Sequence, residues 1–131
     1  MGLVRTTVRL ANLARPDLDE IDVNALVDTG ALHLCIPRHV ALQLGLSATS
    51  QREVRLADGQ SQMVDYVGPL RVALLGREAY AGALVLGDEV LLGAIPMEDM
   101  DLMVHPARLR VIKNPESPNV PLSMAKGMPA P

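Results

Sequence analysis

The stretch LVDTGALHLCI, residues 26–36, decides the fold that we expect for this chain. Apolar residues stand on both sides of Asp28: Leu26-Val27 precede it and Leu34-Cys35-Ile36 follow. Placing a carboxylate between buried flanks is unfavourable unless the group is paired, hydrogen-bonded or kept neutral. Asp28 therefore needs a structural or a chemical reason to be there.

Residues before this stretch alternate between apolar and polar side chains. One face of residues 4–10 carries Val4, Thr6, Val8 and Leu10, and one face of residues 21–27 carries Ile21, Val23, Ala25 and Val27. A period of two is typical of half-buried strands. The sequence predicts two strands, joined by a solvated loop over residues 12–20 that contains Pro16 and several charges.

After the stretch, Pro37 opens a short helix that we expect to end at Gly45. The pair Asp58-Gly59 stands between two alternating arms over residues 52–66 and predicts a β-hairpin. A second hairpin is expected to join residues 70–75 to residues 80–86 through Gly76-Arg77-Glu78.

The last third of the chain is expected to hold a strand over residues 90–93, a short helix over 95–103 and a strand over 109–112. The helix would have one apolar face made of Ile95, Met97, Met100 and Met103, with the methionines as core residues. Five of the ten prolines lie beyond Asn114, namely Pro115, Pro118, Pro121, Pro129 and Pro131. We therefore expect a mostly β domain over residues 1–113 and an irregular Pro-rich tail over 114–131.

Composition limits the classes of partner. With 131 residues, 49% of them hydrophobic and 21% charged, the chain is the size of one folded domain. Two Tyr, no Phe or Trp, a formal net charge of -3 and scattered basic residues argue against nucleic acid as a partner. No apolar run is long enough to cross a membrane, and a single cysteine favours a reducing, cytoplasmic location.

The order of the motifs resembles the retropepsin-like aspartic proteases, which are single-domain and homodimeric. The resemblance rests on Asp28-Thr29-Gly30-Ala31 at the end of an apolar strand, the Asp58-Gly59 hairpin, and Leu91-Leu92-Gly93 before a short helix. It covers residues 3–113, and the runs DTGALHLCIPRHVALQLGL and NPESPNVPLSMAKG are similar to bacterial members. It implies an all-β, closed barrel with one or two short helices and an endopeptidase activity that needs no metal or cofactor.

The resemblance also assigns roles to residues. Asp28 would be catalytic, the Thr29 hydroxyl would lock the two active-site loops across the dimer, and Gly30 would let the backbone approach substrate. The Asp58-Gly59 hairpin would be the flap that closes over a peptide. The residues expected to bind substrate are Gly30, Ala31, Leu32, Asp58, Gly59, Glu89 and Leu91.

Physical chemistry explains why such an enzyme needs two copies of the chain. Two carboxylates about 3 Å apart cannot both be ionised near neutrality, so they share one proton. One then accepts a proton from the attacking water while the other donates to the peptide carbonyl oxygen. Because this chain has one Asp-Thr-Gly, the second carboxylate must come from a twofold-related copy.

Three positions depart from the retroviral pattern. The hairpin tip has only Gly59, Ala94 stands where an arginine braces the retroviral dimer, and Leu32-His33 replace two acidic residues that bind the substrate main chain. These departures concern peptide binding and dimer contacts. They do not touch the pair of aspartates that the resemblance implies.

Other interpretations remain open at this point. Asp28 could simply cap a turn through its side chain, with Leu91-Leu92-Gly93 as an ordinary core strand and Glu89 as a solvent-facing residue. His33 and Cys35 could form a metal site or a Cys-His nucleophile, or Cys35 could only pack. The fold could also serve a catalytically inactive module that dimerises and binds peptides.

Overall fold

The two strands expected at the start of the chain form an antiparallel pair. The structure, a computed structural model, describes residues 3–125 and 127. In it β1 (Val4–Asn12) and β2 (Ile21–Val27) pair from Val4 opposite Val27 to Leu10 opposite Ile21. Val8, Leu10 and Ala25 are fully buried. The period-two pattern is therefore confirmed, with the buried face as predicted.

The other elements follow in chain order. They are β3 (Leu34–Ile36), α1 (Arg38–Gln43), β4 (Ala48–Arg55), β5 (Ser61–Leu74), β6 (Arg77–Val85), β7 (Val90–Leu92), α2 (Ala94–Asp99), β8 (Leu102–His105) and β9 (Arg110–Lys113). Helix α1 begins after Pro37 and is followed by Gly45, which has φ +63°, so its predicted limits are confirmed.

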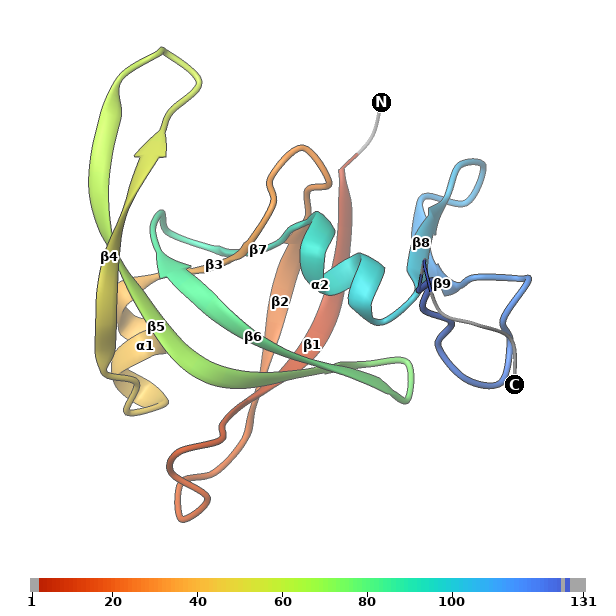
Figure 1. The fold of residues 1–131 in the computed structure, drawn as a ribbon, viewed down its shortest axis with the longest axis horizontal. Helices are drawn as coiled ribbons and strands as arrows, with labels where there is room; N and C mark the ends of the chain where they lie inside the picture. The colour runs from red at the N-terminus through yellow and green to blue at the C-terminus, as the bar shows by residue number, and fades with distance from the viewer. Residues whose placement is uncertain (1–2, 126, 128–131) are drawn as a thin grey trace.

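Six strands close into a barrel. The sheet has the order β1-β2-β7-β3-β6-β5-β4, and β1 also pairs with β5, which joins the sheet to itself (Figure 1). Among the described strands β4 pairs only with β5, and the two extend away from the barrel as a long hairpin (Figure 1). The expected closed, all-β barrel with short helices is confirmed.

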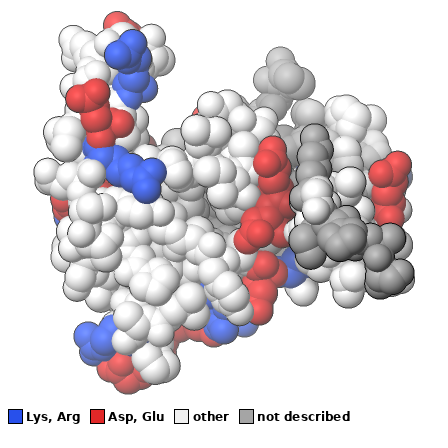
Figure 2. Space-filling model, in the orientation of Figure 1, with Lys and Arg blue, Asp and Glu red and all other residues white. Residues whose placement is uncertain are grey.

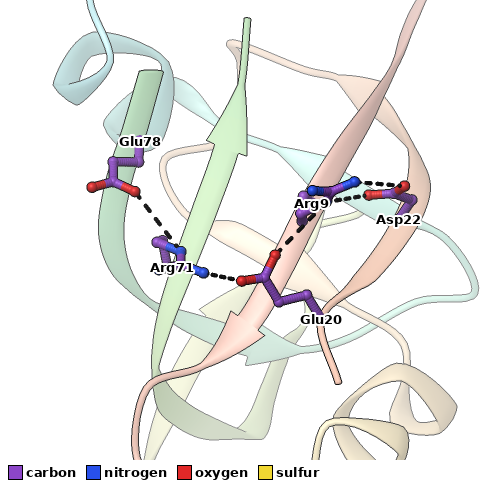
Figure 3. Close-up of polar contacts among 5 residues, drawn as sticks. All are labelled: Arg9, Glu20, Asp22, Arg71 and Glu78. Carbon is purple, nitrogen blue, oxygen red and sulfur yellow. Dashed lines mark hydrogen bonds and ion pairs between the residues drawn. The ribbon is translucent and has the colours of Figure 1, made fainter. Parts of the chain in front are cut away.

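Ion pairs cross the outer face where β1 meets β5 (Figure 3). Arg9 on β1 donates to Asp22 from Nε at 2.9 Å, and its Nε also lies 3.7 Å from Glu20. Glu20 accepts a hydrogen bond from Arg71 on β5, which in turn lies 3.8 Å from Glu78 on β6. The network therefore links strands on both sides of the closure.

The barrel interior is aliphatic. Its largest fully buried side chains come from strands on all sides and from both helix regions; they include Leu10, Leu34, Ile36, Leu44, Leu70, Leu92 and Met100. A second, smaller cluster of Cys35, Val64 and Leu84, with Val54 and Tyr66 against it, lies between the barrel and the β4–β5 hairpin. The core is therefore formed by close packing of aliphatic side chains, without Phe or Trp.

The first predicted hairpin is confirmed and the second needs a correction. Arg55 pairs with Ser61, and the tip between them contains Gly59 with φ +87°. In the second hairpin the turn is Leu75-Gly76, not Gly76-Arg77-Glu78. Leu75 and Gly76 both have positive φ. A two-residue turn with this backbone conformation matches the right-handed twist of the two strands that it joins. Arg77 is therefore the first residue of β6.

The helix expected over residues 95–103 is wrong in its extent. Helix α2 ends at Asp99, and residues 102–113 form a hairpin of β8 and β9. Asp101 takes φ +54°, which stops the helix and turns the chain. Met97 and Met100 are buried as expected, but Ile95 and Met103 are 46% and 42% exposed and do not belong to a common buried face.

The start of the expected tail is bound to the domain. Ser117 and Asn114 donate hydrogen bonds to the carboxylate of Asp101, as does the backbone N–H of Leu122. Arg77, which is only 4% exposed, donates to the carbonyl oxygens of Met100, Asp101 and Ser117. Residues 114–125 contain no helix or strand. Pro129 and Pro131 lie outside the described residues, and the division at residues 113 and 114 stays a prediction.

None of the helices in residues 3–125 is sufficiently long and apolar to span a membrane.

Candidate active site

Asp28 begins a loop at the end of β2, where β2 runs parallel to β7. Its backbone N–H donates to the carbonyl oxygen of Leu92 at 3.0 Å. In the single chain Asp28, Thr29 and Gly30 are exposed, while Leu34, Cys35 and Ile36 are buried. The expected burial of Asp28 between its flanks is therefore absent within one chain, because the loop lifts the carboxylate out of the barrel.

The loop over residues 28–33 is held against the start of α2. Ala94 and Ile95 donate backbone hydrogen bonds of 2.8 Å to the carbonyl oxygens of Ala31 and Leu32. A Cβ atom at Gly93 would lie 2.4 Å from the carbonyl oxygen of His33, which is a severe overlap. Gly93 is thus required by the close approach of two backbones. This contact explains why a chain with the Asp-Thr-Gly loop also has a glycine after Leu91-Leu92, far away in the sequence.

The Asp28 side chain makes one hydrogen bond within its own loop. The backbone N–H of Gly30 donates to Oδ1 of Asp28 at 3.1 Å, and Ala31 N–H donates to the Asp28 carbonyl oxygen at 3.1 Å. This is the turn geometry of the capping interpretation. It also fixes the carboxylate rotamer, so it agrees with either role of Asp28.

A cavity of about 520 Å³ opens beside Asp28. It lies between the loop and the β4–β5 hairpin, and it is lined by Asp28, Gly30, Ala31, Leu32, His33, Cys35, Arg52, Glu53, Val54, Arg55, Leu56, Ala57, Leu84, Leu86 and Leu91. Of the predicted substrate-binding residues, Gly30, Ala31, Leu32 and Leu91 share this cavity with Asp28. We call it the cleft.

The other three predicted substrate-binding residues do not line the cleft. Asp58 accepts a hydrogen bond from Gln60 N–H at 2.9 Å, and Gly59 lies at the open hairpin tip. Glu89 is turned toward Arg5, whose guanidinium donates to it at 3.2 Å. In the described chain residues 52–57, before the tip, form that wall of the cleft instead.

Arg52, Tyr66 and His33 contact one another in and beside the cleft, and the sequence did not predict this contact. Arg52 on β4 lies with its guanidinium carbon 4.2 Å from the ring centre of Tyr66, and the ring of His33 meets the Tyr66 ring edge-on at 6.3 Å. Burial and then the charge of Arg52 lower the pKa of His33. Because the three residues come from separate segments, no local pattern in the sequence signals their contact.

Thr29 faces a different hollow from Asp28. It lines a second cavity of about 340 Å³ together with Ala94, Met97, Glu98, Leu102, Met103 and Val104. The loop thus presents its carboxylate to the cleft and its threonine to the region of α2 and β8.

The geometry supports neither a metal site nor a Cys-His nucleophile at His33 and Cys35. Within residues 3–125 no three His, Cys, Asp or Glu side chains gather as a metal site would require. Cys35 is 5% exposed, and burial, followed by the charge of Asp28, raises the pKa of its thiol. A raised pKa disfavours the thiolate that a cysteine nucleophile needs.

Comparisons with known proteins agree with this picture. Residues 14–76, which include Asp28 and the β4–β5 hairpin, match the aspartyl protease family. The fold is similar to the EIAV protease in complex with an inhibitor, with a TM-score of 0.55, 18% identity, and coverage of 75% of this chain and 88% of that one. The simian foamy virus (mac) protease gives a TM-score of 0.48 at 17% identity, covering 70% and 91%. No curated protein sequence matches.

The family match covers the aspartate loop and the hairpin, and the structural similarity to the EIAV protease covers the barrel around them. The sequence thus matches the aspartyl protease family over slightly less than half of the chain, and the barrel has the fold of a retroviral protease.

Proposed function

We propose that the chain is an aspartic endopeptidase whose active site forms when two copies bring their Asp28 side chains together across a twofold axis. The observation that carries the proposal is the exposed Asp28 carboxylate at the edge of a cleft in a chain with one Asp-Thr-Gly. One chain supplies half of the required pair of carboxylates. A symmetric dimer supplies the other half.

In such a dimer the reaction needs only the two carboxylates and a water molecule. The ionised Asp28 accepts a proton from the water as it attacks the peptide carbon, and the protonated Asp28 of the other copy donates to the carbonyl oxygen. The Asp28 that took a proton from the water then donates it to the leaving nitrogen as the carbon–nitrogen bond breaks, and the other Asp28 takes back the proton from the hydroxyl group. No metal or cofactor takes part in this scheme.

The neighbouring residues would serve positioning and binding. The hydrogen bond from Gly30 N–H holds the Asp28 rotamer, and Thr29, on the other side of the loop, is available to the second copy. Gly30, Ala31, Leu32 and Leu91 would contact the peptide from within the cleft. Asp58 and Gly59 would reach it only by movement of the hairpin, and Glu89 only by leaving Arg5.

The protease domain would span residues 1–113, with 114–131 as an appended segment. The substrate would be a peptide or an unfolded protein segment in the cytoplasm, where the lone Cys35 stays reduced.

The experiment compares the wild type with Asp28→Asn on a degenerate peptide mixture at mildly acidic pH. Asparagine keeps the acceptor for Gly30 N–H but cannot act as the base, so cleavage should fall by several orders of magnitude while the far-UV circular dichroism stays the same. Asp19→Asn, which neutralises an exposed carboxylate in the β1–β2 loop, is the matched control and should keep full activity.

The second candidate is the inactive peptide-binding module. It is favoured by the turn hydrogen bond from Gly30 to Asp28, which gives this carboxylate a structural use without catalysis. A folded dimer that cleaves no peptide at any pH would support this candidate. Cleavage that survives Asp28→Asn would contradict the proposed mechanism.

A further inference from the structure

The wall of the cleft opposite Asp28 carries a fixed positive charge. This wall is the β4 arm of the long hairpin, and Arg52 and Val54 alternate onto the same face of it. Val54 packs against Cys35, Val64 and Leu84, so that face is turned toward the barrel. Arg52 therefore points the same way, into the space that a bound peptide would occupy. Figure 2 shows both basic and acidic side chains on this hairpin, beside the hollow that separates it from the rest of the molecule.

The Arg52 side chain packs on Tyr66, which is itself in contact on two sides. Its guanidinium stacks on the Tyr66 ring, with 4.2 Å between the guanidinium carbon and the ring centre. The ring in turn lies directly over Gly82, where an added Cβ atom would be 2.2 Å from it. His33 closes the arrangement from the aspartate loop by its edge-on contact with the same ring. A cation held in this way keeps its donors directed at a fixed place.

Arg52 is also free of an acidic partner. Five other arginines in residues 3–125 form ion pairs with carboxylates: Arg5, Arg9, Arg15, Arg38 and Arg71. Within the same residues no ion pair involves Arg52. Glu53 and Arg55 also line the cleft and carry opposite charges, so the three residues together leave one net positive charge on this wall.

We propose that Arg52 is a specificity-determining residue that selects peptides with an acidic side chain next to the scissile bond, supported by His33 and Tyr66. The inference rests on the proposed endopeptidase function and names its substrate class. A guanidinium binds a carboxylate with two parallel hydrogen bonds, which supplies both strength and orientation. The apolar part of the cleft, from Leu84, Leu86 and Leu91, would hold the adjoining aliphatic side chains of the peptide.

The twofold symmetry of the proposed dimer adds a consequence. Each copy contributes one cleft and one Arg52, so the two guanidinium groups lie on opposite sides of the paired aspartates. A substrate with acidic residues on both sides of the scissile bond should then be cleaved better than one with a single acidic residue. A single acidic residue should be accepted on either side.

The test uses the degenerate peptide mixture with the full-length wild type, Arg52→Gln and Arg52→Glu, and identifies cleaved bonds by mass spectrometry. The wild type should cleave peptides with a flanking Asp or Glu about tenfold or more better than their Asn or Gln counterparts. This ratio should fall close to one in Arg52→Gln. In Arg52→Glu the preference should turn toward Lys and Arg.

Controls separate this inference from the function on which it rests. Arg15→Gln removes an exposed arginine of the β1–β2 loop, outside the cleft residues, and should keep the wild-type ratio. Circular dichroism shows that each variant is folded. Cleavage without an acidic preference, or with one that Arg52→Glu does not alter, would overturn the inference while leaving the protease function intact.

If the wild type cleaves nothing, the protease function fails and binding decides the inference. The same mixture is then passed over immobilised wild type and immobilised Arg52→Glu. Retention of acidic peptides by the wild type alone supports Arg52 as the selecting residue. Equal retention by both proteins overturns it.

Discussion

The α-carbon of Gly93 lies so close to the carbonyl oxygen of His33 that a Cβ atom at this position would be 2.4 Å from that oxygen. The contact joins the loop that carries Asp28 to the start of α2, and the backbone hydrogen bonds from Ala94 and Ile95 run beside it. The position of the candidate catalytic carboxylate thus depends on a glycine more than sixty residues away.

Gly93→Ala should destabilise the chain and displace the aspartate loop. The extra methyl group forces the two backbones apart, and overpacking of this kind costs about 1–3 kcal/mol. Urea denaturation should show a lower midpoint, and peptide cleavage should fall further than the loss of folded protein explains. Gly87→Ala is the control for a glycine without a close neighbour: its positive φ also costs stability, but its cleavage activity should fall only as far as its loss of folded protein explains. A Gly93→Ala protein as stable and active as the wild type would contradict the assigned contact.

Asp101 should make the stability of the chain depend on pH in the acid range. Hydrogen bonds from Ser117, then Asn114 and the Leu122 N–H, lower the pKa of Asp101 to about 2 from its ordinary value of 3.8. Because the folded state lowers the pKa, the stabilisation is complete above pH 3.8 and is lost as the pH falls toward 2.

The measurement compares the melting temperatures of the wild type and Asp101→Asn across that range. The variant should melt lower than the wild type at pH 6, and the gap should narrow between pH 3.8 and 2. Asp19→Asn serves as the control for removal of an exposed carboxyl group. A gap that stays constant over this range would show that the Asp101 charge does not hold the C-terminal segment.

Truncation should separate the bound part of the C-terminal segment from the rest. A chain that ends at Lys113 loses the Ser117 carbonyl oxygen that Arg77 binds, and a buried donor without its acceptor costs about 1–3 kcal/mol. A chain that ends at Ala125 keeps all the contacts to Asp101 and Arg77 that the described residues make. The longer chain should match the wild type in urea denaturation and the shorter one should not. Equal stability would mean that residues 114–122 contribute no net stabilisation.

Local patterns in the sequence were enough to predict much of the barrel. Alternation at Val4 to Leu10 and the Asp58-Gly59 pair predicted a strand and a hairpin correctly, since both depend on neighbouring residues. The β8–β9 hairpin could not be predicted in the same way. The spacing of Met97, Met100 and Met103 is typical of a helix, whereas the turn at Asp101 is stabilised by residues of the C-terminal segment.

The residues of the candidate site likewise include some that the sequence predicted and some that it did not. Asp28 and the loop that follows it were recognisable from one continuous motif, and the cleft contains most of the residues expected beside it. Arg52 was missed because its significance comes from Tyr66 and His33, which belong to other segments. Glu89 lies outside the cleft because it pairs with Arg5, a residue far away in the sequence, and its role in substrate binding stays a prediction.

Mixing experiments test the shared pair of aspartates most directly. Wild type and Asp28→Asn are unfolded together, refolded at a constant total concentration, and assayed for peptide cleavage as the wild-type fraction varies. If each active site needs Asp28 from both copies, activity follows the square of that fraction and an equal mixture retains about a quarter of it. If one chain holds a complete site, activity falls in proportion and an equal mixture retains about half, which would contradict the account.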